Sequence, residues 1–123
     1  MFTKAFSSYA TNDVEKSKKF YKDVLGLQFT EEMGMIKLDI GGHKVGIYPK
    51  PDHSAATFTV LNLMVDNVDT AVDALIAKGV TFEQYKGDIN TDEKGISRDS
   101  RGPVIAWFKD PAGNIISIVQ EKS

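Results

Sequence analysis

Cysteine is absent from this chain of 123 residues. Its absence excludes disulfide bonds, thiolate metal sites and cysteine nucleophiles, and it fits a reducing compartment. Long apolar runs are lacking as well. None approaches the ~20 residues that a membrane-spanning helix needs, and the opening MFTKAFSSYA lacks the apolar core of a secretory signal. We therefore expect a cytoplasmic protein without a membrane partner.

A surplus of positive charge is also missing, because 15 Lys and Arg residues stand against 17 Asp and Glu residues. Domains that bind nucleic acids usually carry a strongly basic face. We therefore expect no nucleic-acid partner. A chain of this length buries enough surface to fold as one domain, here residues 1–123, without disulfide or metal staples.

Motifs of common catalytic sites are lacking too. The sequence has no G-x-S-x-G elbow, P-loop or G-x-G-x-x-G stretch, and its only histidines are His43 and His53. His43 falls in a predicted hairpin turn, where we expect it to face solvent. His53 falls in a Pro-rich bridge, where it either hydrogen-bonds the backbone or lines a ligand site.

The sequence does contain a repeated order of one strand, one helix and three strands. The elements predicted for the first copy are a strand over 3–10, a helix over 12–26, and strands over 27–32, 35–40 and 44–49. Those predicted for the second copy are a strand over 58–65, a helix over 66–79, and strands over 80–86, 103–110 and 114–120. Asn12 or Asp13 is expected to cap the first helix, and Asn67 the second.

This repeat predicts an α+β fold of two βαβββ modules, 1–50 and 57–123, joined by the Pro-rich bridge at 51–56. Each module is expected to form a curved mixed sheet with its helix on the outer face. The inner faces are expected to border a shared cleft, since ligand pockets commonly form at such junctions.

The second copy carries a polar, glycine-punctuated insertion, GDINTDEKGISRDSRG, over residues 87–102. A loop of this length in a compact domain is usually functional or disordered, and we interpret it as a mobile flap over the cleft. Lys94, Arg98 and Arg101 lie in this flap. They either clamp an anionic ligand or stay solvated beside the interleaved acidic residues.

Three segments together have a characteristic pattern: DVEKSKKFYKDVLGLQF, LMVDNVDTAVDALIAKGVTF and WFKDPAGNIISIVQ. In this order around a repeated unit they resemble the vicinal oxygen chelate superfamily, which holds glyoxalase I, extradiol dioxygenases, fosfomycin-resistance enzymes and bleomycin-resistance proteins. The resemblance covers essentially the whole chain. It implies the tandem-module fold, and it implies a homodimer, because members of the superfamily often pair.

The resemblance also implies where a divalent ion would be held, because metal-using members carry His, Gln or Glu on the first and last strand of each module. Here those positions fall on Phe6, Tyr48, Val60 and Ser117. Phe and Val cannot ligate a metal, and Ser and Tyr are poor ligands without imidazole or carboxylate beside them. We therefore expect no metal ion and no cofactor. The resemblance then gives no ground for expecting the glyoxalase or dioxygenase activity of metal-using members in this chain.

Strand alternation predicts which side chains face the cleft. The predicted ligand-binding residues are Phe6, Ser8, Tyr48, Asn62, Met64, Trp107 and Ser117. This mostly apolar and aromatic surface with a few neutral polar groups is typical of a small-molecule pocket, although the same residues can also fill a core. The leading hypothesis is a metal-free protein that binds or sequesters an aromatic or amphipathic molecule. The alternatives are a lyase- or dioxygenase-like enzyme with an atypical metal site, and a non-catalytic interaction module.

Overall fold

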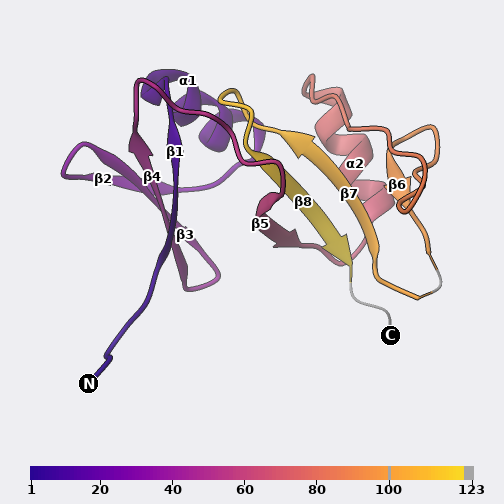
Figure 1. Cartoon of the computed structure of the whole chain (residues 1–123), viewed down its shortest axis with the longest axis horizontal. Coiled ribbons are helices and arrows are strands. Elements are labelled where there is room, and N and C mark those ends of the chain that lie inside the picture. The colour runs from indigo at the N-terminus through magenta and orange to yellow at the C-terminus, as the bar shows by residue number, and fades with distance from the viewer. Residues whose placement is uncertain (100, 121–123) are drawn as a thin grey trace. The chain divides into compact units, whose positions relative to one another are not determined.

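The computed structural model describes residues 1–99 and 101–120 of the chain. The chain divides into two compact units, Met1–Ala55 and Ala56–Ser123, here called the N-terminal and C-terminal units. Each unit holds a mixed four-stranded sheet and a helical segment, so the α+β prediction is confirmed (Figure 1). Ser100, in the predicted flap, and residues 121–123, in the predicted second module, lie outside the described residues.

The sheet of the N-terminal unit has the strand order β1-β4-β3-β2. Its strands are β1 (Ser7–Thr11), β2 (Phe29–Glu32), β3 (Met35–Ile40) and β4 (His43–Pro49). β1 pairs with β4 in parallel, and the other pairs are antiparallel. The strand predicted over 3–10 is therefore shorter at its start than expected.

The first helix begins with α1 (Val14–Lys19) and continues as a π-helical segment, η1 (Phe20–Val24). Asp13, and not Asn12, is its cap, because Asp13 Oδ1 accepts a hydrogen bond from the backbone N–H of Lys16 at 3.0 Å. Gly26 follows the helix with a φ of 69°, the left-handed conformation expected of a residue at this end.

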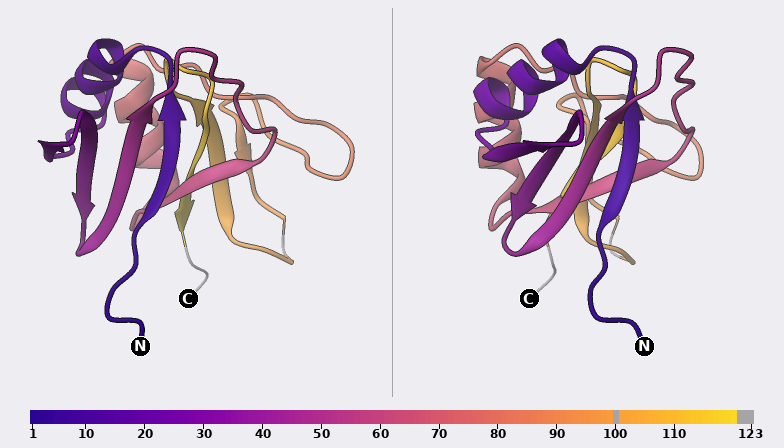
Figure 2. Two further views of the ribbon diagram at one scale, coloured as in Figure 1. Left: turned by 60° about the vertical axis from the view of Figure 1, so that its left-hand side comes forward. Right: turned by 90° about the vertical axis from the view of Figure 1, so that its left-hand side faces the viewer.

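The core of the N-terminal unit lies between this helix and one face of the sheet (Figure 2). Alternating residues of β3 and β4 are fully buried there: Ile36, Leu38, Val45 and Ile47. The hydroxyls of Tyr9 and Tyr21 meet at 2.7 Å within this core, so both buried polar tips are satisfied. Alternation leaves the intervening residues of each strand on the opposite face of the sheet.

The sheet of the C-terminal unit has the strand order β5-β8-β7-β6. Its strands are β5 (Thr59–Met64), β6 (Ile96–Ser97), β7 (Val104–Lys109) and β8 (Ile115–Gln120). The helix α2 (Val68–Ala77) packs against β7 and β8. Asn67 caps it as predicted, with Oδ1 accepting from the Thr70 N–H at 2.9 Å.

The prediction of a strand over 80–86 is wrong. Those residues form a single bridge, between Phe82 and Phe108, and the fourth place in the sheet is taken by β6 from the predicted loop at 87–102. Ile96 is 1% exposed, so burial of this one apolar side chain ties the polar segment to the sheet. A strand of two residues is too short to show alternation in the sequence, and this is why pattern reading missed it.

The turn between β7 and β8 has the expected hairpin form at DPAGN. Asp110 is buried, and its Oδ1 accepts hydrogen bonds from the N–H groups of Ala112 and Asn114, both at 2.9 Å. Gly113 has a φ of 85°, which explains why a residue without Cβ stands there. Among the described residues, no helix is long and apolar enough to cross a membrane.

Candidate functional site

In the C-terminal unit, four predicted site residues lie on the sheet face opposite α2. The Gln120 side chain reaches the N-terminus of α2, where its Oε1 accepts from the Val68 N–H at 2.8 Å. Gln120 therefore marks the helix-facing side of β8, and alternation places Ser117 on the other side. The strand register puts Trp107 and Asn62 beside Ser117.

A hydrogen bond links two of these side chains. Ser117 is fully buried, and its hydroxyl donates to Asn62 Oδ1 at 2.5 Å. The Trp107 ring meets Tyr85 edge-on, with 5.3 Å between the ring centroids. Met64, further along β5, is 63% exposed. The predicted residues Asn62, Met64, Trp107 and Ser117 thus lie on one face of the sheet, and ligand binding by this face stays a prediction.

In the N-terminal unit, the predicted residues Phe6, Ser8 and Tyr48 lie on the face opposite α1. Ser8 pairs with Gly46, and Tyr48, two residues on, shares that face by alternation. A Cβ added to Gly46 would lie 2.7 Å from Met35 Sδ and 3.5 Å from the Phe6 ring. Glycine therefore lets these two apolar side chains approach β4 closely.

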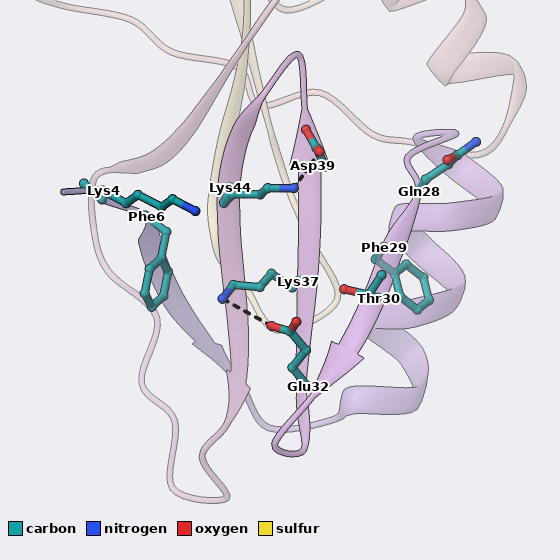
Figure 3. Close-up of a pocket in the computed structure, with 10 residues that line it drawn as sticks. Lys4, Phe6, Gln28, Phe29, Thr30, Glu32, Lys37, Asp39 and Lys44 are labelled. Carbon is teal, nitrogen blue, oxygen red and sulfur yellow. Dashed lines mark hydrogen bonds and ion pairs between the residues drawn. The ribbon is translucent and has the colours of Figure 1, made fainter.

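A pocket of about 620 Å³ lies on this face of the N-terminal unit (Figure 3). It is bordered by the segment before β1 and by residues at or next to β2, β3 and β4: Lys4, Ala5, Phe6, Gln28, Phe29, Thr30, Glu32, Lys37, Asp39 and Lys44. Of the predicted site residues in this unit, Phe6 lines the pocket, whereas Ser8 and Tyr48 are not part of its lining.

The charged residues of this pocket were missed by the sequence prediction, which expected neutral polar groups. Lys37 Nζ lies 3.3 Å from a carboxylate oxygen of Glu32 and 4.5 Å from the centroid of the Phe6 ring. Lys44 Nζ lies 2.6 Å from Asp39 Oδ2, and this hydrogen bond holds the pKa of Asp39 below its usual value. The alternation in MIKLDI, which puts Met35, Lys37 and Asp39 on one face, was the signal available in the sequence.

Residues 5–118 match the family described as the Glyoxalase/Bleomycin resistance protein/Dioxygenase superfamily. The chain belongs to this superfamily. It is 33% identical over 98 residues to the uncharacterized protein YwkD of Bacillus subtilis, a match that covers 68% of this chain and 77% of YwkD. The resemblance inferred from the three sequence segments is thereby confirmed.

Solved structures of the superfamily share the fold over nearly the whole chain. The fosfomycin resistance protein FosX of Listeria monocytogenes aligns with a TM-score of 0.73 at 12% identity, covering 99% of this chain and 95% of FosX. TnmS3 of Streptomyces sp. CB03234, described as an antibiotic binding protein, aligns with a TM-score of 0.70 at 20% identity, covering 99% of both chains. At these identities the likeness establishes the fold alone.

The resemblance places the four metal-ligand positions of the superfamily on Phe6, Tyr48, Val60 and Ser117, and this assignment stays a prediction. Nowhere in residues 1–99 and 101–120 do three His, Cys, Asp or Glu side chains gather so that they could hold a metal ion. His43 is exposed at the start of β4, as expected.

The other histidine, His53, is fixed through its backbone. Its N–H donates to the carbonyl of Lys50 at 2.9 Å. Its side-chain Nε2 is buried and has no hydrogen-bond partner within the part of the chain that the structure describes. The expected side-chain hydrogen bond to the linker is therefore not made by Nε2.

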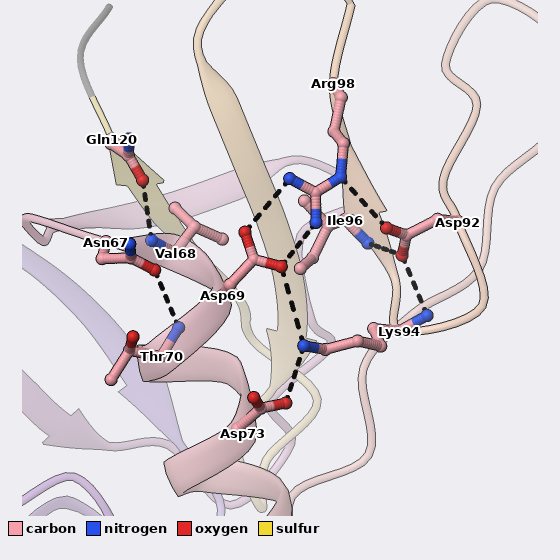
Figure 4. Close-up of polar contacts among 10 residues, drawn as sticks. All are labelled: Asn67, Val68, Asp69, Thr70, Asp73, Asp92, Lys94, Ile96, Arg98 and Gln120. Atoms are coloured by element: carbon pink, nitrogen blue, oxygen red, sulfur yellow. Dashed lines mark hydrogen bonds and ion pairs between the residues drawn. The ribbon is translucent and has the colours of Figure 1, made fainter.

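The cations of the predicted flap pair with protein carboxylates, and Figure 4 shows the pairs of Lys94 and Arg98. Lys94 Nζ lies 2.7 Å from Asp73, and the Arg98 guanidinium donates to both oxygens of Asp69 at 3.1 and 2.6 Å. Arg101 pairs with its near neighbour Asp99 at 3.0 Å. With β6 and the ion pairs to α2, this segment is not a loop throughout. A role in clamping an anionic ligand stays a prediction.

Proposed function

We propose that this protein binds a small aromatic or amphipathic molecule without a metal ion. The observation that carries the proposal is the pocket of about 620 Å³ in the N-terminal unit. Its volume falls in the range of roughly 300–1,000 Å³ that is usual for ligand sites. The Phe6 ring at its edge is 52% exposed and offers an apolar surface for a planar ligand.

The C-terminal unit supports the same proposal with a second surface, which is apolar with a neutral polar group. Trp107 and Met64 offer apolar contact there, and the exposed amide of Asn62 offers hydrogen bonds to a ligand. TnmS3, which has the same fold, is described as an antibiotic binding protein, so this fold is used for ligand binding in another chain. We propose that Ser8 and Tyr48 extend the binding surface of the N-terminal unit beyond the pocket.

Absence of a metal is proposed because none of the four superfamily positions carries an imidazole or a carboxylate. Elemental analysis of the purified, dialysed protein tests this part. Stoichiometric Mn, Fe, Ni or Zn would overturn it and favour the alternative of an enzyme with an atypical metal site.

A thermal-shift screen with aromatic and amphipathic compounds tests ligand binding. A true ligand is expected to raise the melting temperature of the wild-type protein and to raise it less in Phe6→Ala, because the substitution removes the pocket-facing ring. Phe2→Ala is the matched control, since Phe2 belongs to the same segment, is 92% exposed and lies outside the pocket lining. An equal response of both variants would overturn the assignment of the pocket.

We propose further that the protein acts as a cytoplasmic homodimer. The dimer rests on the superfamily resemblance, and the location rests on the absence of cysteine. Light scattering at micromolar concentration is expected to give twice the chain mass of 13.6 kDa, and a clean monomer would overturn the dimer.

A further inference from the structure

The pocket of the N-terminal unit carries one more cation than it has anions. Its lining includes the cations Lys4, Lys37 and Lys44 and the anions Glu32 and Asp39. Two ion pairs, Lys37–Glu32 at 3.3 Å and Lys44–Asp39 at 2.6 Å, use both carboxylates. Lys4 makes no ion pair within the described residues, so its positive charge is not neutralised inside the pocket.

The uncompensated charge lies beside the exposed aromatic ring. In Figure 3, Lys4 extends from the segment before β1 toward β4, and Lys37 extends from β3 across β4, so the two side chains approach from opposite sides. Lys37 Nζ is 4.5 Å from the Phe6 ring centroid, which brings a cation and an apolar surface together. Gly46 on β4 contributes no side chain at this place.

From this arrangement we propose that the pocket selects organic anions, namely a carboxylate or sulfonate group attached to a planar apolar body. The anionic group is held by the ammonium groups of Lys4 and Lys37, and the apolar body lies against Phe6. The inference rests on the proposed function and specifies the charge of the ligand. A charge-assisted hydrogen bond to an ammonium group is about twice as strong as a neutral one.

A cationic ligand fits the same pocket less well for a physical reason. Asp39 already accepts hydrogen bonds from Lys44 Nζ and, at 3.0 Å, from the Gly42 N–H. A bound cation would compete with Lys37 and Lys44 for the two carboxylates, and it would add to the surplus positive charge. Binding an anion uses Lys4 and leaves both pairs in place.

Three naphthalene compounds of similar shape test the proposal by isothermal titration calorimetry: naphthoate, naphthamide and naphthylmethylammonium. The wild-type protein is expected to bind naphthoate about tenfold more tightly than naphthamide, and the difference is expected to shrink at high salt. Lys4→Gln is expected to weaken naphthoate binding about fivefold and to leave naphthamide binding unchanged. Lys16→Gln, on the exposed surface of α1, is the control and should change neither.

The possible failures are distinguishable. Equal affinity for naphthoate and naphthamide, or tighter binding of the ammonium compound, would overturn the anion preference. If Phe6→Ala abolishes binding of whichever naphthalene compound the wild type binds, the proposed small-molecule site still stands. Failure of all three compounds to bind the wild-type protein would contradict both the anion preference and the pocket as an aromatic site.

Discussion

Ser117 Oγ donates a hydrogen bond to Asn62 Oδ1 at 2.5 Å, across the parallel pair of β8 and β5. Ser117 stands where the superfamily resemblance places a metal ligand. Its hydroxyl is used within the protein, and its partner is a neutral amide. The contact therefore joins two strands of the C-terminal sheet and offers no anionic group to a metal ion.

Introducing a carboxylate at this position tests that interpretation. Ser117→Glu is expected to lower the free energy of unfolding by roughly 3 kcal/mol at neutral pH, because an unpaired charge is buried. Burial raises the pKa of the new carboxyl above its unfolded value of about 4.3. The part of the loss that comes from the charge is therefore complete above the folded pKa and vanishes below pH of about 4, where the carboxyl is protonated in both the folded and the unfolded state. Urea unfolding across this pH range measures it.

Ser117→Gln is the matched control, because it has the same size and no charge. Its loss of stability is expected to be independent of pH. An identical pH profile for both variants would contradict the buried-charge interpretation. A stoichiometric metal ion bound by Ser117→Glu would contradict it too, because the other three positions given by the resemblance, Phe6, Tyr48 and Val60, carry no imidazole or carboxylate.

Gly46→Ala tests the close packing beneath the pocket face. The new Cβ would lie 2.7 Å from Met35 Sδ, but a methionine side chain is flexible and can shift. We expect a loss of less than about 1 kcal/mol in stability and a weaker ligand response, since the Met35 side chain that must shift lies on the same face as Phe6. The Phe6 ring itself would make only ordinary contact with the new Cβ, at 3.5 Å. Adding Met35→Ala should restore the response. A full response in Gly46→Ala alone would argue against ligand contact near Gly46.

Gly95→Ala is expected to be more destabilising than Gly87→Ala. Both glycines have positive φ, 85° and 114°, and an alanine in such a conformation costs on the order of 1–2 kcal/mol. Only at Gly95 would the Cβ also meet fixed atoms, Phe82 Cβ at 2.7 Å and the Glu83 carbonyl oxygen at 3.0 Å. Chemical denaturation should show an additional loss of about 1 kcal/mol or more for Gly95→Ala. Equal losses would contradict the packing of β6 against Phe82.

The pair between Arg98 and Asp69 predicts a pH-dependent contribution to stability. The hydrogen bonds from Arg98 lower the pKa of Asp69 below its unfolded value of about 3.9. The pair therefore stabilises the fold above that value, and the stabilisation is lost as the pH falls through the lower folded pKa. Its size is at most about 1 kcal/mol, because both side chains are about half exposed.

Urea unfolding of Asp69→Asn measures this contribution. The variant should be less stable than the wild type by a constant amount between pH of about 5 and 7, and the two should converge below pH of about 4. Asp88→Asn, at an exposed acid in the polar segment 87–102 that holds Arg98, should follow the wild type throughout. A difference that persists unchanged at low pH would show that the ion pair is not its cause.

Several features could be predicted because their causes are local. Asn67 as a helix cap, Gly26 after a helix and the DPAGN turn all follow from the preferences of single residues for particular backbone conformations. Strand alternation correctly grouped Asn62 with Ser117, since the side-chain period of a strand does not depend on its partners. The three segments that resemble the superfamily then led to the correct fold.

Other features depend on contacts that no local pattern encodes. Ile96 and Ser97 form a strand only because β7 offers an unpaired edge and because Ile96 finds an apolar site, whereas 80–86, with a better strand pattern, forms a single bridge. The pocket brings Lys4 and Lys37 to one place although 33 positions separate them in the sequence. The sequence by itself determined the family, the Asn67 cap and the faces of the strands that it located correctly, because these follow from nearest-neighbour chemistry. Tertiary structure decided which edge was paired and which charges share a pocket, because those depend on the free energy of long-range packing.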